Sequence, residues 1–176
     1  SPYFVAGLTT LAYELGEGGR IPDHVAVPVG GGGLFLGLVQ GFAQLRDRGW
    51  IGRVPRLHIV QPEACAPLVR AGGGGDPVEP DPRATVAEGA RIPRPKRGRE
   101  VLAALGAVDG DAVMVGEEEI LRGQAELAHE EGIWVEPTAA LAVAALPALI
   151  ARGTIGPGEE VVLPLTGHGL KAVNPC

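Results

Sequence analysis

The strongest chemical signal in the chain is a run of four glycines, Gly30 to Gly33, between an apolar segment and a predicted helix that starts at Leu34. Glycines that lead from a strand into a helix let several backbone N–H groups point at one position, where the helix dipole adds about half a positive charge. Such a loop can bind a phosphate group. The alternative is a tight strand-to-helix turn without a ligand, although four glycines lose more conformational entropy than a turn requires.

Two kinds of nucleotide loop are disfavoured by the residues around the glycines. A Walker loop would end in Gly-Lys followed by Ser or Thr, whereas Leu34 and Phe35 follow here. A dinucleotide fingerprint needs the spacing G-x-G-x-x-G, which Gly30, Gly32 and Gly37 do not match. The acidic residue expected about twenty positions further on is also missing.

Two polar residues could share a crevice with the glycines. Thr166 follows the apolar segment VVLPL, and a hydroxyl at the carboxyl end of a strand lies where open α/β sheets bind ligands. Glu136 stands before Pro137 at a predicted helix start and could face the same crevice. The alternatives are a plain Thr-Gly turn and an acidic residue that interacts with a helix N-terminus.

Short apolar runs alternate with longer helical stretches, which predicts an α/β three-layer sandwich with a mostly parallel sheet. Near-continuous apolar strands suit a sheet that is buried on both faces. The predicted strands are residues 24–29, 57–61, 112–115 and 161–165. The predicted helices are residues 8–15, 34–47, 63–71, 98–105, 117–131 and 137–152.

Glycine and proline predict local features of these elements. Gly37 and Gly41 lie four residues apart in the helix predicted over 34–47 and leave a bare stripe for a close neighbour. Pro147 is expected to kink the helix predicted over 137–152. Residues 72–82 are predicted as a loop, and the basic run 91–99 as a solvated connector instead of a phosphate or nucleic-acid patch.

The composition excludes several classes of protein. The chain has 176 residues, 45% hydrophobic and 20% charged, with a formal net charge of −6, which favours one or two globular domains and disfavours nucleic-acid binding. No apolar run approaches the roughly 18 residues of a membrane span. Two cysteines, Cys65 and Cys176, are too few for a disulfide framework, which is consistent with a cytoplasmic location, and no metal-site spacing is visible.

The segments VPVGGGGLFLGLVQGF, GEEEILRGQAELAHEEGIWVEPTAA and VVLPLTGHGLK occur in this order. Together they resemble the pyridoxal-phosphate enzymes of the tryptophan-synthase-β type (fold type II), and within them threonine synthase, for which TGHGLK is the most specific motif. The resemblance covers nearly all 176 residues. It implies that residues 1–176 are a large-domain portion of such an enzyme.

The resemblance also implies a set of residues that bind pyridoxal 5′-phosphate. Thr166 would hydrogen-bond the pyridine nitrogen, and Glu136 would lie near the ring. A neutral hydroxyl stabilises a protonated ring less than a carboxylate would, so the ring would be a weaker electron sink. The cofactor phosphate would be held by backbone amides of the glycines and of the first helical residue, namely Gly30, Gly31, Gly32, Gly33 and Leu34.

The implied reaction converts O-phosphohomoserine and water to threonine and phosphate, with an amino acid as substrate and a homodimer as the complete enzyme. Threonine synthases commonly carry asparagines at the positions of Gly31 and Leu34, and the all-glycine loop is more similar to threonine or serine dehydratases. Those enzymes usually end in a Ser-Gly-Gly-Asn type motif instead of TGHGLK. A dehydratase or another β-replacement enzyme of this fold is therefore the alternative.

The chemistry of this family requires a lysine that forms a Schiff base with the cofactor. The chain has two lysines, Lys96 in RPKRGR and Lys171 after TGHGL, and neither stands in a context like that of the family's lysine. We therefore assign no catalytic residue and expect a C-terminal portion that lacks the small domain and the cofactor-linking lysine, and that is inactive alone. A non-catalytic module derived from such an enzyme is a further alternative.

Overall fold

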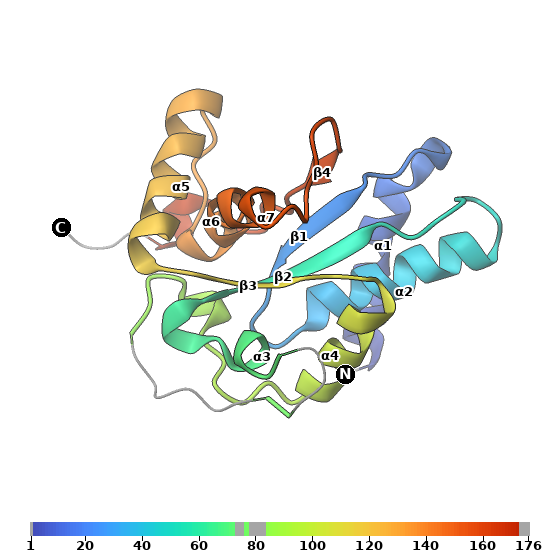
Figure 1. Ribbon diagram of the computed structural model, residues 1–176, viewed down its shortest axis with the longest axis horizontal. Coiled ribbons are helices and arrows are strands. Elements are labelled where there is room, and N and C mark those ends of the chain that lie inside the picture. Colours follow the sequence, from blue (N-terminus) through green and yellow to red (C-terminus); the bar gives the residue numbers. More distant parts are fainter. Residues whose placement is uncertain (1, 73–75, 78–83, 173–176) are drawn as a thin grey trace.

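Four parallel strands form the sheet at the centre of the computed structural model, which describes residues 2–72, 76–77 and 84–172 (Figure 1). The strands are β1 (His24–Pro28), β2 (Arg56–Pro62), β3 (Ala112–Val115) and β4 (Val161–Val162). They lie in the order β3-β2-β1-β4, and Val25 of β1 is opposite Leu57 of β2 and Val162 of β4. The predicted parallel sheet is confirmed.

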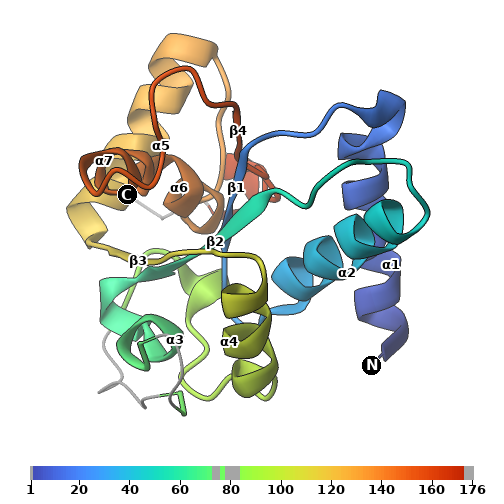
Figure 2. The same cartoon turned by 45° about the vertical axis from the view of Figure 1, so that its right-hand side comes forward.

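Helices cover both faces of this sheet, which confirms the predicted three-layer sandwich (Figures 1 and 2). One face carries α1 (Pro2–Leu15), α2 (Gly33–Asp47), α3 (Pro67–Arg70) and α4 (Gly98–Ala107). The other face carries α5 (Glu117–Glu131), α6 (Pro137–Ala144) and α7 (Leu146–Ala151). Within the described residues, no helix combines the length and the apolarity that crossing a membrane requires.

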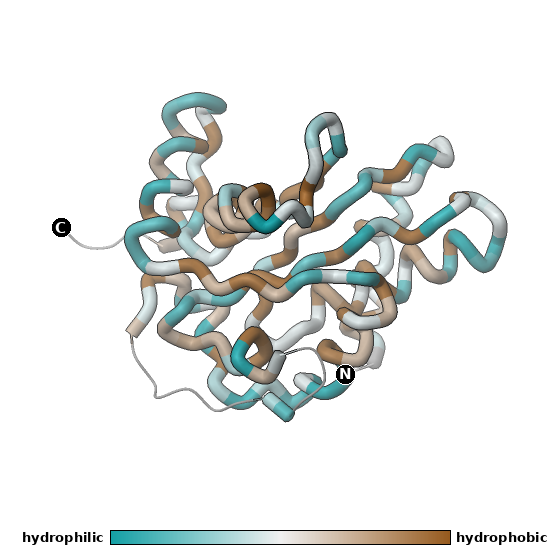
Figure 3. Tube along the Cα trace, in the orientation of Figure 1, coloured by the Kyte–Doolittle hydropathy of each residue, from teal (hydrophilic) through white to brown (hydrophobic). Residues whose placement is uncertain are grey.

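Each face of the sheet has its own hydrophobic core, because consecutive residues of a strand point to opposite sides. Val25 and Val27 of β1 belong to the core under α1, α2 and α4, whereas Ala26 between them belongs to the core under α5, α6 and α7. Figure 3 shows hydrophobic residues along the central strands and hydrophilic residues at the outer ends of α2 and α5.

Prolines divide two of the predicted helices. The helix predicted over 63–71 is wrong in its middle: a 3-10 turn over Glu63–Cys65 comes first, and α3 begins only at Pro67. The residue before a proline avoids the helical region, and Ala66 has φ −121° and ψ 56°. The kink predicted at Pro147 is confirmed, because the helical segment over 137–152 is divided into α6 and α7.

Other boundaries differ as well. β4 ends at Val162 instead of residue 165, and Pro164 has no N–H to donate to a neighbouring strand. The first helix begins at Pro2, before the predicted residue 8. Most of the loop predicted over 72–82 lies outside the described residues. In the basic run 91–99, exposed Arg99 forms an ion pair with Asp76, with Nε 2.5 Å from Oδ1.

The glycine stripe of α2 is packed against α1. A Cβ at Gly37 would lie 2.5 Å from Cβ of Leu8, and a Cβ at Gly41 would lie 2.7 Å from the carbonyl oxygen of Thr9. The close neighbour predicted for these two glycines is therefore confirmed, and it is the helix that precedes β1. Because α2 begins in the glycine run, this packing also holds the run in place.

Replacing Gly41 with valine is expected to lower the free energy of unfolding by about 3 kcal/mol, because the new side chain must push two packed backbones apart. Urea denaturation followed by circular dichroism measures this loss. The matched control is Gly106→Ala in α4, where a Cβ meets no atom within 4 Å and alanine is the better helix former by about 1 kcal/mol. Unchanged stability of Gly41→Val would contradict the close packing of α1 on α2.

A chain of hydrogen bonds joins two buried histidines at the amino ends of the strands. The backbone N–H of Asp111 donates to Nδ1 of His58 over 3.0 Å, and Nε2 of His58 lies 3.0 Å from Nδ1 of His24. Nε2 of His24 lies 3.0 Å from Oε2 of Glu159. The two imidazole rings are stacked, with centroids 5.2 Å apart.

The donors in this chain assign both histidine tautomers. A backbone N–H can only donate, so Nδ1 of His58 accepts and the proton of the neutral ring is on Nε2. That proton is donated to Nδ1 of His24, whose own Nε2–H is donated to the carboxylate of Glu159. Burial lowers the pKa of His58 to about 4, and protonation of His24 on acidification acts in the same direction through its positive charge.

Candidate phosphate-binding site

The glycine loop, Gly30 to Gly33, connects β1 to α2 at the carboxyl edge of the sheet. Gly32 is the N-cap of α2 and has φ 83° and ψ 2°, a left-handed conformation that glycine adopts without strain. A Cβ at this position would also overlap Cγ2 of Val101 in α4. Both the backbone conformation and the surrounding space therefore require glycine at position 32.

The glycine loop has unpaired donors and an open side. No hydrogen bond joins the backbone N–H of Gly30, Gly31 or Gly32 to an acceptor among the described residues. The first helical hydrogen bond runs from the N–H of Leu36 to the carbonyl of Gly32, which leaves the first-turn N–H groups free as well. Gly31 is exposed, and a Cβ there would meet no atom within 4 Å. This arrangement fits an anion that approaches past Gly31.

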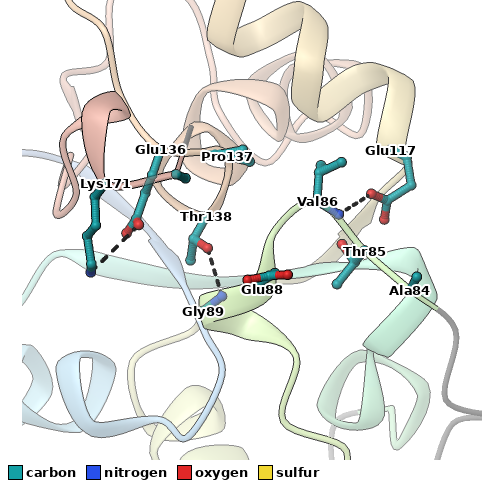
Figure 4. Close-up of a pocket in the computed structure, with 11 residues that line it drawn as sticks. Ala84, Thr85, Val86, Glu88, Gly89, Glu117, Glu136, Pro137, Thr138 and Lys171 are labelled. Carbon is teal, nitrogen blue, oxygen red and sulfur yellow. Dashed lines mark hydrogen bonds and ion pairs between the residues drawn. The ribbon is translucent and has the colours of Figure 1, made fainter. Parts of the chain in front are cut away.

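A short 3-10 turn over Glu88–Ala90 packs on the other side of the glycine loop. A Cβ at Gly30 would lie 2.8 Å from the carbonyl oxygen of Gly89. The N–H of Gly89 donates to Oγ1 of Thr138 in α6 over 3.0 Å, as Figure 4 shows. The turn is thus held between the glycine loop and the first residues of α6.

A cavity of about 750 Å³ lies between this turn and the starts of α5 and α6 (Figure 4). Its charged lining residues are Glu88, Glu117, Glu136 and Lys171. Oε2 of Glu117 accepts the N–H of Val86 over 2.7 Å, while its buried Oε1 has no partner within the described part of the chain. Gly89 lines the cavity and also contacts Gly30, so the cavity adjoins the glycine loop.

The structure brings Glu136 together with the motif that contains Thr166. The N–H of Glu136 donates to the carbonyl of Gly167 over 2.9 Å, and Val135 forms an antiparallel bridge with His168. A Cβ at Gly167 would overlap the carboxylate of Glu136, so the Glu136 side chain lies directly against Gly167. Nζ of Lys171 lies 3.7 Å from Oε2 of Glu136, and the two side chains point toward one another in Figure 4.

Thr166 follows β4 at the same edge of the sheet as the glycine loop. β4 pairs in parallel with β1, and the glycine loop follows β1, so both segments leave the sheet at its carboxyl edge. Thr166 is exposed, and it does not line the cavity beside Glu136. Both segments therefore lie at one edge of the sheet, and the crevice that Thr166, Glu136 and the glycine loop are expected to share stays a prediction.

Several residues of this region were not predicted from the sequence. Thr138 and Gly89 join α6 to the turn beside the glycine loop, and Lys171 pairs with Glu136. Thr138 had a weak signal, because it lies two residues after Glu136 at a predicted helix start. Gly89 had none, because its partner Thr138 is 49 residues away. Of the two lysines, Lys96 is exposed in the connector before α4.

Comparisons with known proteins place this geometry in a family. Residues 1–167 match the model of the family described as "Pyridoxal-phosphate dependent enzyme". The chain is 36% identical to threonine synthase of Methanosarcina acetivorans, covering 97% of this chain and 43% of that protein. It is 33% identical to threonine synthase of Halalkalibacterium halodurans, covering 99% of this chain and 48% of that protein. The chain thus spans about half the length of these curated relatives.

Solved structures agree with the fold. A threonine deaminase from T.th. superposes with a TM-score of 0.76 at 30% identity, covering 99% of this chain and 61% of that one. The processed threonine deaminase isoform 2 of Solanum lycopersicum superposes with a TM-score of 0.78 at 23% identity, covering 96% of this chain and 46% of that one. The second likeness concerns the fold alone.

Proposed function

The chain belongs to the family of pyridoxal-phosphate-dependent enzymes, and from this premise we propose that the protein is a threonine synthase-like enzyme. Its reaction converts O-phosphohomoserine and water to threonine and phosphate. The observation that carries the proposal is the joint placement of the glycine loop and the TGHGLK segment at one edge of the sheet. The similarity to threonine synthases over nearly the whole chain supports this choice of reaction.

Pyridoxal phosphate supplies an electron sink for reactions at the carbon atoms of an amino acid. In the proposed site, the N–H groups of the glycine loop, followed by Leu34 in the first turn of α2, hold its phosphate. The hydroxyl of Thr166 donates a hydrogen bond to the pyridine nitrogen. Glu136 holds the TGHGLK segment through its backbone N–H, which donates to the carbonyl of Gly167, and through the ion pair of its side chain with Lys171.

A threonine or serine dehydratase is the second candidate, and one feature of the loop favours it. Position 31 is glycine, where the resemblance to threonine synthase would place asparagine. The 30% identity to a threonine deaminase of known structure points the same way. The TGHGLK motif and the threonine synthase relatives favour the first candidate over this one.

The proposed reaction predicts a specific product pattern for the protein produced at its natural length. O-phosphohomoserine should yield threonine and inorganic phosphate in equal amounts, measured by amino-acid analysis and a phosphate assay. A dehydratase that is given threonine would instead form 2-oxobutyrate, and it would release no phosphate from O-phosphohomoserine. Formation of 2-oxobutyrate as the sole product would overturn the synthase proposal and support the second candidate.

Cofactor binding can be tested apart from the reaction. Pyridoxal phosphate should bind far more tightly than pyridoxal, because only the former presents a phosphate to the glycine loop. After borohydride reduction and peptide mapping, we expect neither Lys96 nor Lys171 to carry the label, since neither matches the family's lysine. Equal affinity for the two compounds, or a label on either lysine, would contradict the proposed site.

A further inference from the structure

A buried glutamine at the end of β2 is bonded directly to the start of the glycine loop. Gln61 is fully buried, and its Nε2 donates to the carbonyl oxygen of Val29 over 3.0 Å. Its Oε1 accepts hydrogen bonds from the N–H groups of Leu68 and Val69, over 2.9 and 3.3 Å respectively. Both of these residues belong to the first turn of α3. One amide therefore joins the residue before Gly30 to a second element of the fold.

The hydrogen bond to Val29 acts on the first donor of the glycine loop. The carbonyl of Val29 and the N–H of Gly30 belong to one planar trans peptide, in which the two groups point in opposite directions. Val29 is also held on its other side, because its N–H donates to the carbonyl of Val60 over 2.8 Å. Fixing the Val29 carbonyl therefore fixes the direction of the Gly30 N–H, which points away from Gln61.

The same hydrogen bond strengthens that donor. A peptide whose carbonyl accepts a hydrogen bond is more polarised, so its N–H becomes a better donor, and the effect is larger in a buried, low-dielectric setting. Within the described residues, the Gly30 N–H has no acceptor of its own. This N–H is therefore available to an anion bound in the loop.

The residue type at position 61 matches both tasks. An amide can donate to Val29 and accept from α3 at the same time, whereas a carboxylate can only accept and an aliphatic side chain can do neither. Because Gln61 is fully buried, water cannot replace either hydrogen bond. The presence of this polar side chain in a buried strand is therefore explained by its two partners.

We propose that Gln61 is a positioning residue for phosphate binding, which aims and polarises the Gly30 N–H through the carbonyl of Val29. The inference rests on the proposed function, in which the glycine loop holds the phosphate of pyridoxal phosphate. It adds that affinity for the phosphate depends on a side chain that does not touch it. This role differs from a purely structural one because Gln61 would affect the binding of the phosphate and not the binding of the pyridoxal ring.

The first test compares Gln61→Leu with the wild type, both at natural length, by titrating pyridoxal phosphate and pyridoxal. The ratio of the two affinities should fall about tenfold in Gln61→Leu, with pyridoxal binding unchanged. The matched control is Gln124→Leu, which removes a buried amide that donates to the carbonyl of Val135 over 2.6 Å. That variant should lose similar stability and keep the affinity ratio within about twofold of the wild type.

The second test uses Gln61→Glu, which keeps the acceptor for α3 and removes the donor to Val29. At alkaline pH the ratio of affinities should be as low as in Gln61→Leu. Burial raises the pKa of a carboxyl group, so mild acidification should protonate the new side chain, restore a donor and bring the ratio back toward the wild-type value at the same pH. A chelator excludes a cation that could bridge the carboxylate and the carbonyl.

A spectroscopic signal reports the proposed link directly. In the ligand-free protein, the amide ¹⁵N resonance of Gly30 should move upfield in Gln61→Leu and stay in place in Gln124→Leu. An unchanged affinity ratio in Gln61→Leu would overturn the inference. If the Leu variant does not fold, Gln61→Glu decides the question: failure of its affinity ratio to recover on acidification would overturn the inference. Absence of any preference for pyridoxal phosphate in the wild type would instead overturn the proposed function.

Discussion

Replacing Gly31 with aspartate is expected to weaken the binding of pyridoxal phosphate about a thousandfold without unfolding the protein. Gly31 is exposed, its φ is not in the left-handed region, and a Cβ there meets no atom within 4 Å, so the side chain is accommodated. A carboxylate about 4 Å from the phosphate costs about 4 kcal/mol at an effective dielectric constant of about 20. Each 1.4 kcal/mol corresponds to roughly a tenfold change in affinity. Equilibrium dialysis or the cofactor absorbance measures the change.

Two further variants separate charge from shape at this loop. Gly31→Asn has nearly the same size as the aspartate variant and no charge, so it should keep affinity within about tenfold of the wild type. Gly32→Asp should abolish cofactor retention, but the left-handed backbone and the overlap with Val101 also strain the fold there. Wild-type affinity in a folded Gly31→Asp protein would show that the phosphate binds elsewhere.

Acidification from neutral pH is expected to destabilise the fold through His58, by about 2 kcal/mol at pH 5 and about 3 kcal/mol at pH 4. The pKa of this residue in the folded protein is lowered to about 4, chiefly by burial. In the unfolded chain it returns to about 6.5, so the unfolded state binds the proton first as the pH falls. The stabilising effect is complete above pH 6.5 and is lost progressively down to pH 4.

The neighbours of His58 determine how this prediction is checked. The carboxylate of Glu159 has a lowered pKa, because it accepts the N–H of Gly156 and a hydrogen bond from His24, so it also loses stabilisation on acidification, at lower pH. Urea unfolding at about pH 7, 6 and 5 therefore isolates the contribution of the histidine. The variant His58→Gln does not titrate, so its stability should change much less over this range. A pH dependence as steep as that of the wild type would rule out His58 as the cause.

Local patterns in the sequence predicted most of the helices and strands, and they also predicted the glycine loop. The strand, the four glycines and the helix that follows are contiguous, so their order alone predicts a phosphate loop at the start of α2. The bare stripe at Gly37 and Gly41 likewise predicted a close neighbour. Only the identity of that neighbour, α1, required the structure. Two errors occur at Pro67 and Pro164, where a missing N–H or a restricted preceding residue overrode the apolar pattern. A third is the start of α1, which lies at Pro2 instead of residue 8.

The amino-acid sequence by itself determined the α/β class, the glycine loop and the family, because these depend on periodicity and on motifs of a few consecutive residues. Only the tertiary structure decided how the pieces meet: Gln61 bonds to Val29 across 32 residues, and Thr138 bonds to Gly89 across 49. It also placed Glu136 against Gly167 and His24 against His58. The physical reason is that such side chains bind donors and acceptors on other elements of the fold, and strand order and register set which of these lie within reach.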